Sequence, residues 1–130
     1  MVLARGLRKS FGKPGEEFEA VRGIDVDVRR GEAFGFLGPN GAGKTTTIRT
    51  LLDHIRPTSG RATIFGIETT VDPVGIHRRI GYLPGEFALY DKLTGGQTIE
   101  YFANLRGGVD ATYQKQLLQR LKRHQHQLLK

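Results

Sequence analysis

The chain has 130 residues and a formal net charge of +7, with 38% hydrophobic and 25% charged residues. These values fit one globular domain and exclude a chain that is disordered throughout. The absence of cysteine excludes disulfide scaffolds, thiol catalysis and cysteine metal sites. No apolar run reaches the roughly 18 residues of a membrane span, and no apolar signal core opens the chain. We therefore expect a cytoplasmic protein.

The positive charge is concentrated at the carboxyl-terminal end. Residues 114–130 contain no acidic residue and five basic ones: Lys115, Arg120, Lys122, Arg123 and Lys130. Two interpretations stay open, a solvated or disordered tail and a surface for an anionic partner. Aromatic side chains are not interleaved with the basic ones, which argues against nucleic acid as that partner.

The first part of the chain predicts strands and one helix. Residues 2–11 predict a strand, residues 12–15 a turn, and the strict alternation over residues 24–28 a second strand. The short apolar run over residues 33–37 predicts a central strand that is buried on both faces. Apolar residues at helical spacing then predict one helix, with the stripe Ile48, Leu51, Leu52 and Ile55.

The second part predicts further short elements. Residues 62–65 and 80–83 predict two strands, with a short helix over residues 73–79 between them. A helix is expected to begin at Thr94 and to end at Gly107-Gly108. The chain is thus divided into residues 1–109, one part of a domain, and residues 110–130, a basic, glutamine-rich helix or tail.

The strongest motif is GPNGAGKT at residues 38–45, which fits G-x-x-x-x-G-K-[ST] at each fixed position. Glycine lets a backbone curl closely around an anion, and the following helix adds unpaired N–H groups. We expect Lys44 to reach the β- and γ-phosphates, Thr45 to bind Mg²⁺, and Thr46 to donate toward the α-phosphate. The expected binding set is Gly38, Pro39, Asn40, Gly41, Ala42, Gly43, Lys44, Thr45 and Thr46.

From Phe34 to Thr47 the sequence resembles the ATP-binding subunits of ABC transporters, most closely the exporter or drug-resistance-like branch. The segments 23–28, 31–32, 57–60 and 80–84 agree, so the resemblance runs from about Leu3 to Gly107. It implies an α/β, P-loop NTPase fold, with an incomplete RecA-like core, an antiparallel β-subdomain and the start of the helical subdomain. It also implies that ATP and Mg²⁺ bind here.

The resemblance extends to partners and to the nucleotide base. Full-length members energise transport across a membrane by ATP hydrolysis. The implied partners are a membrane-spanning transporter subunit and a second ATP-binding subunit in a dimer, at the inner face of the cell membrane. Phe11 lies where the adenine-stacking aromatic residue of the family belongs. The alternative for Phe11 is a strand-end side chain that packs in the core.

Two features depart from the family pattern. Gly85 occupies the place of the Q-loop glutamine, and Glu86 is a candidate for a compensating catalytic role or else a solvated carboxylate. The signature motif, Walker B aspartate, catalytic glutamate and switch histidine are absent from the 130 residues. ATP hydrolysis therefore stays open beside a non-enzymatic nucleotide-binding regulator or an inactive truncated remnant. Thr94 and Gln97, within a segment similar to the signature, instead fit a helix capping box.

Overall fold

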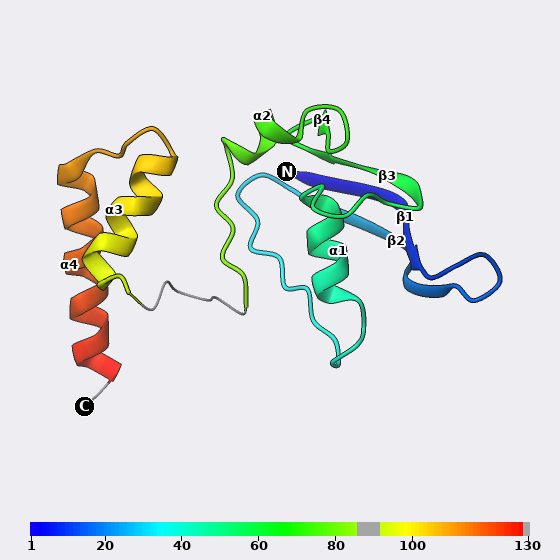
Figure 1. The fold of residues 1–130 in the computed structure, drawn as a ribbon, viewed down its shortest axis with the longest axis horizontal. Helices are drawn as coiled ribbons and strands as arrows, with labels where there is room; N and C mark the ends of the chain where they lie inside the picture. The colour runs from blue at the N-terminus through cyan, green and yellow to red at the C-terminus, as the bar shows by residue number, and fades with distance from the viewer. Residues whose placement is uncertain (86–91, 129–130) are drawn as a thin grey trace. The chain divides into compact units, whose positions relative to one another are not determined.

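The computed structural model describes residues 1–85 and 92–128. The chain divides into two compact units, Met1–Tyr82 and Leu83–Lys130. Figure 1 labels the elements of the first unit: β1 (Val2–Phe11), β2 (Phe18–Val28), α1 (Lys44–Leu51), β3 (Ser59–Ile64), β4 (Ile67–Glu68) and α2 (Pro73–His77). The second unit holds α3 (Gly95–Leu105) and α4 (Ala111–Leu128).

The four strands form one antiparallel sheet in the order β2-β1-β3-β4. The predicted strand over residues 2–11 is β1, and most of the other two predicted strands lies within β2 and β3. Helix α1 contacts β1, β2 and β3. The core lies between this helix and the sheet, with the residues Ala4, Leu7, Val26 and Ala62 buried and Ile24, Val28 and Leu51 packed against them.

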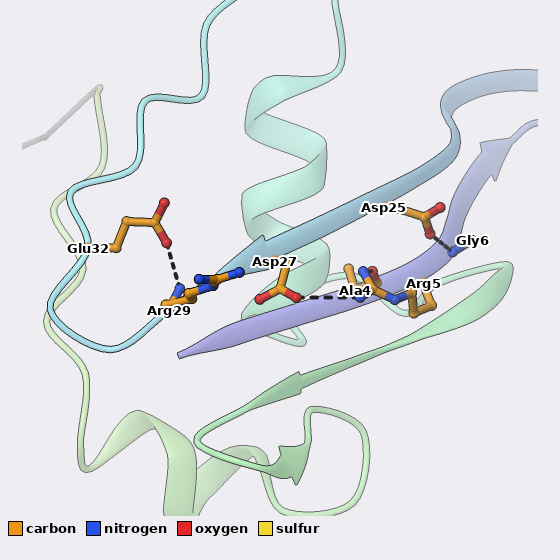
Figure 2. Close-up of polar contacts among 7 residues, drawn as sticks. All are labelled: Ala4, Arg5, Gly6, Asp25, Asp27, Arg29 and Glu32. Carbon is orange, nitrogen blue, oxygen red and sulfur yellow. Dashed lines mark hydrogen bonds and ion pairs between the residues drawn. The ribbon is translucent and has the colours of Figure 1, made fainter.

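A bulge in β1 brings two core residues to the same side of the sheet. Ala4 and Leu7 are three positions apart, so strict alternation would point them to opposite faces. The register with β2 shifts between them, at Gly6, whose φ is 54°. Figure 2 shows the Gly6 N–H donating to Asp25 Oδ1, at 2.7 Å. Strand β3 passes close to this bulge. A Cβ built at Gly60 would lie only 2.2 Å from the Gly6 carbonyl oxygen.

Two of the predicted strands are wrong. Residues 33–37 and 80–83 lie outside the sheet, and the side chain of Leu37 is 91% exposed. A strand forms only where a neighbour takes its backbone hydrogen bonds. Among the described residues, the sheet offers these two segments no parallel partner. Figure 2 shows how β2 ends instead, with the Arg29 N–H donating to Glu32 Oε2 at 2.7 Å.

The helices of the second unit begin where the sequence predicts. Thr94 precedes α3 with the expected capping box, in which the Gln97 N–H donates to Thr94 Oγ1 at 3.3 Å. The Gln97 side chain accepts from the Thr94 N–H at 2.8 Å. Asp110 precedes α4 and accepts the Tyr113 N–H at 2.6 Å. Within residues 1–85 and 92–128, no helix combines the length and the apolarity that crossing a bilayer requires.

Candidate functional site

The glycine-rich loop over residues 38–43 leads directly into α1 and is held against β2. Gly41 and Gly43 have φ values of 82° and 81°, in the left-handed region that favours glycine. A Cβ at Gly43 would lie 2.2 Å from the Ala20 carbonyl oxygen in β2. Glycine at position 43 is therefore required both by its backbone angle and by its contact with the sheet.

The Lys44 ammonium group lies within the curve of this loop. Its Nζ donates to the carbonyl oxygens of Gly38 and Pro39, at 2.5 and 2.7 Å. Lys44 is also the first residue of α1, where unpaired N–H groups and the positive end of the helix dipole lie. The first turn of α1 carries no acidic residue. The positive charge at this point suits a phosphate group. When a phosphate binds, Lys44 would exchange its two carbonyl partners for phosphate oxygens.

The four threonines of α1 differ in burial. Thr47 and Thr50 are buried, and their hydroxyls donate to the carbonyl oxygens of Gly43 and Thr46 at 2.9 and 2.8 Å. These two hydroxyls therefore have their hydrogen-bond partners within the helix itself. Thr45 is exposed and Thr46 is half-buried in the first turn. Because Mg²⁺ prefers oxygen ligands, the exposed Thr45 hydroxyl fits the role that the sequence predicts for it.

A cavity of about 370 Å³ opens beside the loop. Its size is within the range of small-ligand sites. It is lined by Phe18 and Ala20 of β2 and by seven of the nine predicted phosphate-binding residues: Asn40, Gly41, Ala42, Gly43, Lys44, Thr45 and Thr46. The structure therefore brings most of the predicted set together around one space.

Phe18 is a site residue that the sequence prediction missed. It is 60% exposed, lies directly opposite Phe11 in the β1–β2 ladder, and lines the cavity. Directly opposed residues share one face of a sheet, so the two rings lie on the same side. Phe11 is exposed as well, with Lys9 Nζ 5.0 Å from its ring centroid, and it is not among the residues lining this cavity. The stacking role of Phe11 stays a prediction.

The remaining candidates lie elsewhere. Glu86 falls outside the described residues. Gly85 is exposed, and no described atom lies within 4 Å of a Cβ built on it. His77 Nε2 lies 2.7 Å from the Leu52 carbonyl oxygen and so links α2 to the end of α1. No short sequence pattern predicts this link. Over the described part of the chain, no group of three His, Cys, Asp or Glu side chains could hold a metal ion.

Comparison with known proteins gives consistent relatives. The family model described as ABC transporter matches residues 21–129. ABC transporter A family member 7 of Dictyostelium discoideum is 42% identical over 106 residues, which cover 82% of this chain and 12% of that protein. The probable multidrug ABC transporter ATP-binding protein YbhF of Escherichia coli is 36% identical over 121 residues, covering 93% of this chain and 20% of that protein.

A solved structure has the same fold. The dimeric post-hydrolysis state of the ATP-binding cassette MJ0796, bound to ADP and Pi, superposes with a TM-score of 0.73 and 23% identity. The match covers 89% of this chain and 53% of that one, so the chain spans about half of its structural neighbour and less of the relatives above. This likeness confirms the predicted P-loop NTPase fold class.

Proposed function

The chain belongs to the ABC transporter family, and on that premise we propose that it binds Mg-ATP at the loop over residues 38–46. The observation that carries the proposal is the position of the Lys44 ammonium group, which donates to two carbonyl oxygens of the loop at 2.5 and 2.7 Å. A triphosphate supplies stronger, charged acceptors than those carbonyls. ATP would therefore draw the Lys44 ammonium group away from these carbonyl oxygens, and Lys44 would donate to the phosphate oxygens instead.

The surrounding residues have complementary roles in this proposal. The loop N–H groups and the start of α1 would receive the phosphates, with Lys44 at the β- and γ-phosphates and Thr46 toward the α-phosphate. Thr45 would hold Mg²⁺ through its hydroxyl, and the metal, when bound, neutralises phosphate charge. Phe11 and Phe18 would contact the base, because exposed rings on one face of a sheet offer a stacking surface.

The wider role follows from the family and is proposed with it. The chain would energise transport with a membrane-spanning transporter subunit, at the inner face of the cell membrane. A second ATP-binding subunit would complete a dimer, in the manner of the dimeric solved neighbour. Glu86 would contact the reacting water region from the position next to Gly85, whose hydrogen side chain provides no ligand.

Titration of the 130-residue chain with Mg-ATP in a calorimeter tests nucleotide binding. We expect saturable heat, and a loss of affinity of roughly tenfold to a hundredfold in Lys44→Ala, because one charged hydrogen bond contributes about 1.5–3 kcal/mol. Lys13→Ala removes an exposed lysine from the hairpin turn and is the matched control. A folded chain that gives no heat, or a Lys44→Ala variant that binds like wild type, contradicts the proposal.

A second candidate, nucleotide binding without hydrolysis, is favoured by one observation. Gly85 stands at the Q-loop position, where its hydrogen side chain provides no ligand. Single-turnover hydrolysis of labelled ATP, measured with a full-length ABC ATP-binding subunit present, separates the two. Turnover that vanishes with Lys44→Ala assigns an enzyme. Binding without turnover assigns a nucleotide-binding regulator or inactive remnant.

A further inference from the structure

Helix α4 carries an exposed apolar face over residues 113–121. Tyr113, Leu117 and Leu121 recur every four residues, so they follow one side of the helix. Tyr113 is 60% exposed and Leu121 is 64% exposed. With Leu118 included, the apolar sector is roughly 140° wide, as on helices that bury one face. Gln114 is the one polar side chain in this sector between residues 113 and 122.

Basic side chains border this apolar face. By helical projection, Arg120 lies beside Tyr113 at one edge of the sector, and Lys122 lies beside Leu118 at the other edge. Both basic residues are exposed. The sequence of α4 from Ala111 to Leu128 contains no aspartate or glutamate. The helix therefore presents apolar and cationic groups together, with no negative charge among them.

We propose that α4 binds to the surface of an anionic lipid bilayer. A helix of this composition lies in the interface, with its leucines among the acyl chains and its basic side chains at the headgroups. The side chains of Arg120 and Lys122 have long apolar stems. Their charged ends can therefore remain in water while the apolar face of the helix is buried in the bilayer. The helix does not span the bilayer, in keeping with its low apolarity.

Charge and apolarity together favour lipid over nucleic acid. Phosphate groups of DNA or RNA would pair with Arg120 and Lys122, but they would leave Leu117 and Leu121 in water. A lipid surface accepts both kinds of group. Each basic residue near an anionic surface raises binding roughly fivefold, since it contributes about 1 kcal/mol. This inference goes beyond nucleotide binding and uses none of the residues of the loop 38–46.

Vesicle flotation with the full 130-residue chain tests the proposal. The probe is vesicles of phosphatidylcholine and phosphatidylserine in a three-to-one ratio, compared with pure phosphatidylcholine. We expect flotation with the anionic vesicles alone. Arg120→Gln with Lys122→Gln is expected to weaken it at least about tenfold, as is Leu117→Gln with Leu121→Gln. Glutamine preserves helix propensity, and far-UV circular dichroism checks that α4 is retained.

A matched control separates the helix from the net charge. Lys13→Gln with Arg30→Gln removes the same charge from exposed positions outside α4 and is expected to float like wild type. Failure of the wild-type chain to float with anionic vesicles overturns the proposal. So does a control pair that weakens binding as much as the Arg120 and Lys122 pair. Retention on DNA that the leucine substitutions leave unchanged, without vesicle binding, assigns α4 to nucleic acid instead.

Discussion

Gly43 holds the loop over residues 38–43 against the sheet, and Gly43→Ala tests how much that contact stabilises the protein. The new Cβ would lie 2.2 Å from the Ala20 carbonyl oxygen, so α1 would have to move away from β2. Overpacking of this kind costs about 1–3 kcal/mol. A left-handed backbone, here with φ of 81°, costs an alanine about 1–2 kcal/mol more. We therefore expect a loss of about 2–5 kcal/mol in the free energy of unfolding.

Gly41→Ala is the matched control for the contact with β2. Gly41 has nearly the same φ, 82°, but a Cβ there would meet nothing within 4 Å. Only the backbone cost of about 1–2 kcal/mol should remain. The difference between the two variants, about 1–3 kcal/mol, measures the crowding at Ala20.

Urea unfolding followed by far-UV circular dichroism gives both free energies, provided the slope stays constant. Calorimetry with Mg-ATP then shows whether displacing the start of α1 also weakens nucleotide binding in Gly43→Ala. Equal stability of the two variants would contradict this prediction, because the close approach of Gly43 to β2 would then have no energetic consequence. A Gly43→Ala variant as stable as wild type would also contradict the predicted cost of the left-handed backbone at this position.

Three further outcomes are expected. Phe18→Ala should weaken ATP binding roughly fivefold to a hundredfold, since base stacking contributes about 1–3 kcal/mol. The binding of inorganic tripolyphosphate, which has no base, should not change. Phe11→Ala, measured in the same titrations, shows whether both rings contact the base. Thr94→Ala should lower the stability of α3 by about 1 kcal/mol, because the helix loses its cap. This loss should be visible as faster amide exchange in the first turn of α3. Thr94→Ser keeps the capping hydroxyl and should show no such change. Gly85→Gln should leave the melting temperature unchanged within about 1 °C, because no described atom lies within 4 Å of the new Cβ. A clear fall in the melting temperature would show that the side chain at this position is packed.

The features that the sequence predicted correctly depend on neighbours along the chain. The capping box of α3 needs only Thr94 and Gln97, and the start of α4 needs only Asp110 and the turn after it. The phosphate-loop motif likewise places Lys44 at the first turn of a helix, where the structure has it. Local hydrogen bonds and backbone angles decide each of these, so a pattern of a few residues is sufficient.

The features that were missed depend on contacts between distant segments. Phe18 lines the cavity because the hairpin pairs it with Phe11 and brings β2 to the loop, and its own surroundings in sequence are acidic. The strand β2 begins six residues before the predicted start at Ile24. His77 reaches the Leu52 carbonyl across 25 positions of chain. Neither the pairing of Phe18 with Phe11 nor the contact of His77 with Leu52 has a short sequence pattern that would predict it.

The loop keeps its shape although the segment before it forms no strand. The sequence predicts a buried central strand over residues 33–37, yet Leu37 is almost fully exposed. The loop is held from its other end instead, where Gly43 lies against Ala20 of β2 and Lys44 bonds back to Gly38. The loop geometry on which the proposed phosphate binding rests therefore depends on α1 and the antiparallel sheet. A parallel partner for residues 33–37 would bury their apolar side chains without being needed to form the loop.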